Sequence, residues 1–440
     1  MAAIHEDAEA SAGASDVNGA RWDSEDLVRR LCWALDIAER AVDRLAAAGY
    51  ADPDEVGNHL RPEKLIAETA FLLLSASTAG RYPEVERRVR RVAERLTPHA
   101  RSERMILGIC LEPALALDYA EAHICLARLG YPDVRFDAAL RRSLGAQAHA
   151  SRERPPHRVL EQDWLMSGWT GARACRAARS SQAVWNSALG RSIDLLGCTR
   201  EDVYAFTHAL MYVADQDLHP RRLPRPKPVI LEEAEAALAW CLDEQDYDLG
   251  GEVLLAWPLV RRPWSAGAAF AFRVLAHVED QAGFLPAPST RLQRLNALRG
   301  DARINYLLAT AYHTAYVMGM LCAAVLRFGR TPPSKIPRTL AARGSAHRIL
   351  PLLDADGMHP HWRGEFDHLR GPEQDAIAGF LLAIALRRKV GRRDIAGLHD
   401  VLAMGLSLGL ADSPAASQAA ELLERLAGAA PELPVAAGRS

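Results

Sequence analysis

The sequence lacks the short motifs by which many enzyme classes are recognised. Its seven cysteines among 440 residues are widely spaced, odd in number and never arranged as Cys-x-x-Cys. This spacing predicts neither a disulfide framework nor a zinc ribbon. No Gly-rich phosphate-binding loop follows a strand pattern, and neither Gly-x-Ser-x-Gly nor Ser-x-x-Lys is present. We therefore expect no Rossmann or P-loop nucleotide site, and we assign neither a cofactor nor a metal ligand.

Targeting signals and strong charge are also missing. The N-terminus has neither the basic nor the apolar segment of a signal peptide, and apolar runs such as 70–74 and 380–386 are too short to span a bilayer. The formal net charge is −2, which gives no global reason to expect a polyanionic partner. The interpretation is a cytoplasmic protein with no membrane partner.

What the sequence does contain is a helical pattern over most of its length. Ala, Leu and Arg dominate, apolar residues recur every three and four positions, and β-branched alternation is scarce. Two similar loops, Gly80–Val85 and Gly130–Val134, each separate a helical segment from a basic one. Their glycines suit helix ends, and their prolines prevent simple continuation. The prediction is an all-α fold of stacked helical hairpins, with a closed α/α toroid as one form of it.

Composition divides the chain into segments. Four prolines fall within residues 219–228, which predicts a semi-rigid connector. The connector separates an N-terminal half, 21–218, from a C-terminal half, 229–430. Residues 1–20 and 431–440 have the composition of a disordered leader and tail.

The stretch from Thr207 to Pro220 carries the strongest candidate site. Read as a helix, it places His208, Tyr212, Asp215 and His219 on one stripe. A carboxylate one turn from an imidazole orients it and raises its basicity, and a phenol can donate a proton. The same stripe could hold a metal, or be a buried hydrogen-bond network.

A second polar helix is predicted over residues 305–319. Tyr306 and His313 share one of its faces, and Tyr312 and Tyr316 share the adjacent face. Small residues between them would leave room for a ligand, so we expect His313 as a proton donor and the tyrosines, with His219, as substrate contacts. The alternative is close helix packing. His123, on a stripe in an earlier helix, is expected to belong to a core network.

Basic runs are the remaining candidates for binding. Arg88 and Arg91 lie in the run Arg87–Arg91, and further arginines follow at Arg141 and Arg142. Each run alone is typical of a solvated face. If the basic helices of the two hairpins are neighbours, however, their arginines would form a ridge that could hold the backbone of aminoacyl-tRNA, a candidate partner.

One turn carries a resemblance to known enzymes. The segment Asp280-Gln-Ala-Gly-Phe-Leu-Pro286 resembles loops of α/α-toroid enzymes, a group that includes class II terpene cyclases, protein prenyltransferase β-subunits and lanthionine cyclases. The resemblance implies a fold and no activity. Asp215-Gln-Asp217 does not match the acid cluster of the terpene cyclases, and no zinc thiolate set matches the lanthionine cyclases.

The chain as a whole also resembles the proteins that transfer a seryl group from seryl-tRNA to a hydroxylamine in valanimycin-type azoxy antibiotic pathways. No motif carries this resemblance, so it assigns no residue. It implies an aminoacyl transferase of specialised metabolism. For such a reaction our own hypothesis is that His208 held by Asp215 would be the base and Tyr212 or His313 the proton donor. The alternatives are a cyclase, isomerase or hydrolase acting on a small metabolite, and a non-enzymatic helical scaffold.

Overall fold

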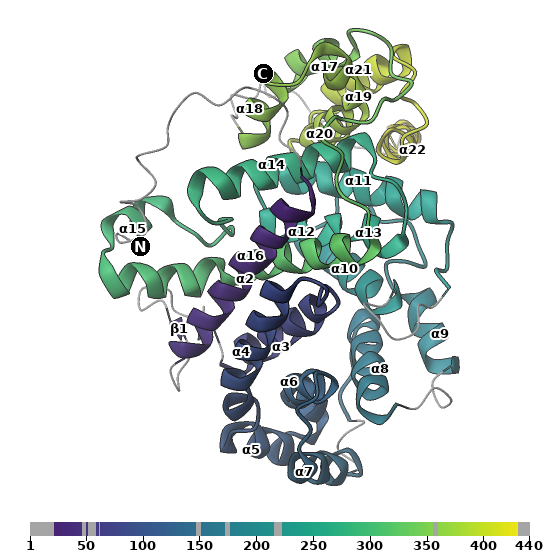
Figure 1. Ribbon diagram of the computed structural model, residues 1–440. Coiled ribbons are helices and arrows are strands. Elements are labelled where there is room, and N and C mark those ends of the chain that lie inside the picture. Colours follow the sequence, from purple (N-terminus) through teal and green to yellow (C-terminus); the bar gives the residue numbers. More distant parts are fainter. Residues whose placement is uncertain are drawn as a thin grey trace, which may run out of the picture. The chain divides into compact units, whose positions relative to one another are not determined.

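The prediction of an all-α protein is confirmed. The computed structural model describes residues 22–45, 50–51, 59–60, 62–146, 151–171, 177–214, 222–354 and 360–429. These residues are mostly helical (Figure 1). The exception within them is a pair of two-residue strands, β1 (Tyr50–Ala51) and β2 (His59–Leu60), which pair antiparallel with Tyr50 opposite Leu60. The predicted leader and tail, the N-terminal part of the connector, Asp215 and His219 lie outside the described residues.

The chain divides into two compact units. The first unit contains residues 1–177 and 279–335, and the second contains residues 178–278 and 336–440. This grouping differs from the division at 219–228 that composition suggests, because residues 279–335 return to the N-terminal helices. Proline content marks a local break in the chain and carries no information on which distant helices pack together.

The first unit is built around one long helix. Its elements are α2 (Ser24–Asp43), α3 (Pro62–Ser77), α4 (Pro83–Ala100), α5 (Glu103–Leu111), a 3-10 turn η2 (Pro113–Leu115), α6 (Ala116–Arg128), α7 (Val134–Leu144), α8 (Pro156–Thr170), α15 (Leu292–Ala297) and α16 (Gly300–Phe328). Both predicted hairpin loops are present between helices, since α3 ends at Ser77 before α4, and α6 ends at Arg128 before α7. Gly130 adopts φ +95° in the second loop, a conformation that favours glycine.

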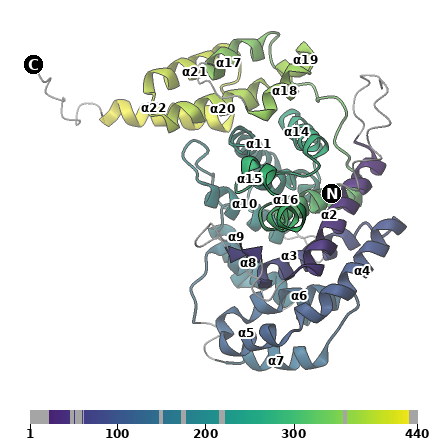
Figure 2. The same cartoon turned by 90° about the vertical axis from the view of Figure 1, so that its left-hand side faces the viewer.

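Helix α16 supplies much of this unit's core and packs against α2 and α3, as the view along its axis in Figure 2 shows. Gly319 allows the close approach, because a Cβ there would lie 2.6 Å from the Cβ of Ala34. By length and composition α16 could cross a membrane, contrary to the expectation from short apolar runs. Its most apolar window is 83% buried within the protein, however, as in the core helix of a soluble protein.

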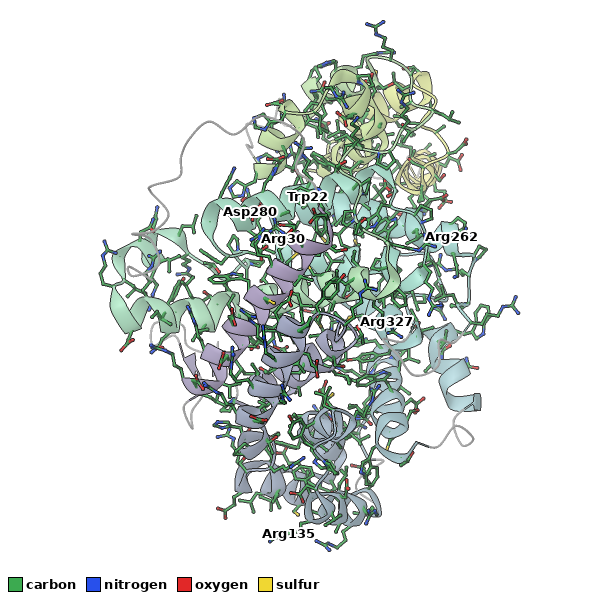
Figure 3. The ribbon with its side chains drawn as sticks, in the orientation of Figure 1. Trp22, Arg30, Arg135, Arg262, Asp280 and Arg327 are labelled. Atoms are coloured by element: carbon green, nitrogen blue, oxygen red, sulfur yellow. The ribbon has the colours of Figure 1, made fainter. Side chains whose placement is uncertain are left out.

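A buried arginine joins α2 to the end of α14 (Ala266–Ala282). The Arg30 guanidinium lies 2.9 Å from Asp26, 2.5 Å from Glu279 and 2.7 Å from Asp280. It also stacks 5.5 Å from the ring of Trp22 (Figure 3). Three carboxylates and an aromatic face compensate for removing this charge from water.

The second unit consists of shorter helices. They are α9 (Ala177–Asn186, whose first residue belongs to the first unit), α10 (Arg200–Ala214), α11 (Lys227–Asp243), α12 (Tyr247–Leu254), α13 (Ala256–Val260), most of α14, α17 (Ser345–Asp354), α18 (His361–Asp367), α19 (Gly371–Ala376), α20 (Ala378–Gly391), α21 (Ile395–Ser407) and α22 (Pro414–Ala429). Helix α11 packs against α12 and α20. Closure of the helices into a toroid stays a prediction.

Candidate active site

The predicted site residues fall in different units. His208 and Tyr212 lie on α10 in the second unit, whereas Tyr306, Tyr312, His313 and Tyr316 lie on α16 in the first. The candidate polar side chains therefore form two separate groups, one in each unit.

The first group, the His208 centre, consists of His208, Thr207 and Tyr204 of α10 with Glu252 of α12. Nδ1 of His208 lies 3.1 Å from the carbonyl oxygen of Tyr204 and 3.5 Å from the carboxylate of Glu252. Glu252 is buried and accepts a 2.7 Å hydrogen bond from the Thr207 hydroxyl. The Tyr204 ring lies against the imidazole, with their centroids 3.7 Å apart. The carboxylate beside His208 thus comes from another helix.

The second group surrounds Glu68 of α3. The phenol of Tyr312 donates to the Glu68 carboxylate, and Nε2 of His313 lies 3.5 Å from it. Lys64, one turn earlier on α3, lies 3.7 Å away at the surface. A half-buried carboxylate is therefore held between a phenol and an imidazole from α16.

The other two tyrosines of α16 serve packing. Tyr316 is 1% exposed, and its hydroxyl lies 3.0 Å from that of Thr69. Tyr306 is buried, and its hydroxyl accepts a hydrogen bond from the backbone N–H of Arg291. Their placement agrees with close helix packing, the alternative given above for the helix predicted over residues 305–319.

Glu68 also belongs to a cluster of carboxyl groups that influence one another electrostatically, which we call the Glu121 centre. Its members come from three helices that pack in sequence, α3 on α6 and α6 on α8. They are Glu68, Asp118, Glu121 and Glu161. Three of them have hydrogen-bond partners: Glu68 as above, Asp118, which accepts a 3.5 Å hydrogen bond from Gln162, and Glu161, which receives two of 2.9 and 2.7 Å from Arg158.

Glu121 differs from its neighbours. Among the residues that the structure describes, none forms a hydrogen bond or an ion pair with its carboxyl group. Burial raises the pKa of Glu121 well above its ordinary value, the charges of Glu161, Asp118 and Glu68 raise it further, and Arg158 opposes them. Burial likewise raises the pKa of Asp118. Like charges held together in a desolvated place favour the protonated form of one carboxyl group.

The predicted basic ridge is compensated by acids. Arg88, Arg91 and Arg95 of α4 face Asp36, Glu39 and Asp43 of α2 at a constant offset of 52 residues. The Arg88–Asp36 distance is 2.8 Å and the Arg91–Glu39 distance is 2.7 Å. Exposed pairs of this kind add little stability, but they neutralise the positive charge expected of the ridge.

The predicted core role of His123 fits its surroundings. Its side chain is 0% exposed, its Nε2 lies 3.0 Å from Asp137, and its Nδ1 accepts a hydrogen bond from Arg101. The indole of Trp169 donates to the same carboxylate. Within the described part of the chain, no group of three or more His, Cys, Asp and Glu side chains is arranged to hold a metal ion.

A family of domains described as of unknown function, DUF6895, matches residues 33–323, more than half of the chain. The chain belongs to the DUF6895 family. No curated protein and no solved structure matches it. The DUF6895 region includes both centres, from Glu68 to His313, whereas Arg30 precedes it and helices α17–α22 follow it.

The sequence-based prediction missed Glu68, Glu252 and Glu121 in the DUF6895 region, and a local sequence signal marks the last two. Glu252 stands within the apolar run Leu249-Gly-Gly-Glu-Val-Leu-Leu-Ala256, where a lone acid is costly unless it is satisfied. Glu121 interrupts the small apolar face of α6 in the same way. An isolated acid in an apolar helical segment is the signal that could have identified both.

Proposed function

We propose that this chain is an enzyme that acts on a small molecule by general acid–base catalysis, with Glu121 as the proton donor. The observation that carries the proposal is a carboxyl group without a partner among the described residues, surrounded by three other carboxyl groups. A group kept protonated near neutral pH can donate a proton in a reaction that an ordinary glutamate cannot serve.

Glu68 is the matching proton acceptor in this proposal. It is anchored by Tyr312, and His313 at 3.5 Å can supply or withdraw a proton. The Glu121 carboxyl would protonate a leaving group or a double bond, and Glu68 would take up the proton that the substrate loses. A site rich in carboxylates favours a neutral or cationic substrate over an anionic one. The reaction class is thus a cyclisation, isomerisation or hydrolysis that needs no cofactor.

Aminoacyl transfer from a charged tRNA, as in antibiotic biosynthesis, is the second candidate. It is favoured by exposed arginines of the first unit outside the pairs with α2. They are Arg87 and Arg90 of α4 and Arg135, Arg141 and Arg142 of α7, of which Arg135 is labelled in Figure 3. Pairing of Arg88 and Arg91 with α2 reduces the charge available for RNA, and the carboxylates beside Glu68 would repel phosphates, so we place this function second.

The experiment compares Glu121→Gln with a matched control, Glu153→Gln, which changes an exposed glutamate of the same unit. Each protein is incubated with a pool of neutral and cationic metabolites, and masses are followed by mass spectrometry. The proposal predicts a conversion that Glu121→Gln loses at least 100-fold and Glu153→Gln keeps. A conversion that survives Glu121→Gln would refute the role of Glu121.

Salt-dependent binding of charged and uncharged tRNA separates the second candidate. Micromolar binding that weakens steeply with salt and is lost in Arg87→Glu/Arg90→Glu would favour aminoacyl transfer. Absence of both conversion and tRNA binding would favour the non-enzymatic scaffold.

A further inference from the structure

Helix α5 of the first unit exposes an apolar face. Its buried residues, Met105, Gly108 and Ile109, lie on one side of the helix. The opposite side carries exposed residues without charge, which are Ile106, Leu107, Cys110 and Leu111. Leu107 is 48% exposed and Leu111 is 75% exposed. A helix at a protein surface normally places polar residues on its outer side, so this face is typical of a binding surface.

The exposed apolar side chains are concentrated on two neighbouring helices. Ten large hydrophobic residues are exposed in the described part of the chain, and four of them belong to α5 or to Val134, the first residue of α7. Helices α5 and α7 pack side by side (Figure 1, Figure 2). The hydroxyl of Ser143 near the end of α7 donates a 2.6 Å hydrogen bond to the carbonyl of Ile109 near the end of α5. Single exposed hydrophobic residues are ordinary, whereas a group on adjoining helices indicates a contact surface.

Arginines of α7 lie beside this apolar face. Arg141 and Arg142 directly precede the residue that bonds to α5, and Arg135 stands at the start of α7. All three are exposed, and none forms an ion pair with a residue that the structure describes. Two exposed acids, Glu103 and Glu112, stand at the ends of α5, so the arginines are in excess. The combination of exposed aliphatic side chains and unpaired arginines fits a partner that is both anionic and apolar.

An anionic lipid bilayer has this chemistry. Its headgroups attract arginines, and the boundary with the acyl chains accepts aliphatic side chains. Protein interfaces instead draw most of their binding energy from Trp, Tyr and Arg, and leucine is under-represented there. A second copy of the chain docked on the same face would bring the arginines of both copies together. The sequence-based expectation of no membrane partner concerned segments that span a bilayer, and a helix that lies on the surface needs none.

We propose that α5 and α7 form a docking surface for an anionic lipid bilayer. Leu107 and Leu111 enter the boundary between headgroups and acyl chains, and the arginines of α7 contact the headgroups. Each arginine near an anionic surface strengthens binding about fivefold. Each leucine that leaves water strengthens it by about tenfold. The proposal does not rest on the Glu121 centre or on any catalytic activity.

The experiment sediments the full chain with vesicles of phosphatidylcholine alone and of phosphatidylcholine mixed with phosphatidylglycerol. We expect binding to the mixed vesicles that weakens as salt is added, and at least tenfold weaker binding to phosphatidylcholine alone. Leu107→Gln/Leu111→Gln and Arg141→Gln/Arg142→Gln should each weaken binding more than tenfold. Leu292→Gln is the matched control, because Leu292 is 53% exposed on α15 of the same unit, and it should bind like the unmodified protein.

Two results would overturn the proposal. If the leucine pair could be replaced without loss of binding, the contact would be a general attraction between charges. If the unmodified chain did not bind the mixed vesicles at low salt, an acidic protein would be left as the partner of this face. The leucine variants should keep any binding of tRNA, which separates the lipid surface from an RNA surface. None of these results depends on Glu121, so the two proposals fail separately.

Discussion

Arg30 and Arg29 are neighbours on α2 that share carboxylate partners and differ in burial. The side chain of Arg30 is 0% exposed, with Asp26, Glu279 and Asp280 at 2.9, 2.5 and 2.7 Å. That of Arg29 is 59% exposed, with Asp26 at 2.5 Å and Asp280 at 3.3 Å. Arg30→Met keeps the length of the side chain and leaves Glu279 buried without its cation. Removing one partner of a buried pair costs about 3–5 kcal/mol.

The loss should also depend on pH. Burial raises the pKa of Glu279 and Arg30 lowers it, so without Arg30 this carboxyl group takes up a proton more readily. We expect Arg30→Met to lower the free energy of unfolding by about 3–4 kcal/mol at pH 8 and by less at pH 5.

Urea unfolding followed by tryptophan fluorescence measures the loss, since Trp22 lies against Arg30. Arg29→Met is the control and should cost under about 1 kcal/mol, because an exposed pair contributes little. Equal losses in the two variants would refute the reasoning that burial, and not the number of ion pairs, decides the contribution.

Three further predictions concern protonation and packing. Glu121→Gln should stabilise the protein by about 1–2 kcal/mol at pH 8 and little at pH 5, because a raised pKa means that folding binds a proton whose contribution is lost as pH rises. Urea midpoints of the variant and the unmodified protein at both pH values test this, and equal midpoints for the two proteins at pH 8 would contradict it. Burial, with a smaller effect of Arg158, lowers the pKa of His157 to about 4, so the protein loses stability as pH falls from about 6.5 towards 4. His157→Gln should therefore recover about 1 kcal/mol of the free energy of unfolding at pH 5, after allowance for partial exposure. No recovery would indicate a charged His157. Gly319→Ala should lower the free energy of unfolding by about 1–3 kcal/mol through its clash with Ala34, whereas Gly364→Ala, in open space on α18, should leave it unchanged or raise it. The opposite order of the two variants would disprove the close approach at Gly319.

The helical fold was predictable because its determinants are local. Apolar spacing of three and four residues and the loops at Gly80–Val85 and Gly130–Val134 depend on neighbours in the chain, and the structure reproduces them. The grouping of 279–335 with the N-terminal helices depends on packing between distant segments. No pattern within a short window encodes that choice.

The candidate sites show the same limit. His208, Tyr312 and His313 could be singled out because polar residues on an apolar helix are visible in one segment. Their carboxylate partners, Glu252 and Glu68, come from other helices, and spacing within one segment cannot pair them.

The pairing of the α4 arginines could not be predicted for the same reason. Arg88 and Arg91 looked like a binding ridge because their acidic partners lie 52 residues earlier, on α2. A charge run indicates an exposed face, but whether that face is compensated depends on the helix beside it.

The protonation state of Glu121 tests the central claim most directly. The full chain labelled with ¹³C at glutamate carboxyl groups is titrated by NMR, and Glu121→Gln identifies the Glu121 signal. The account predicts a carboxyl group that remains protonated well above the ordinary glutamate pKa of about 4.3. A signal that titrates at the ordinary value would contradict it and remove Glu121 as the acid.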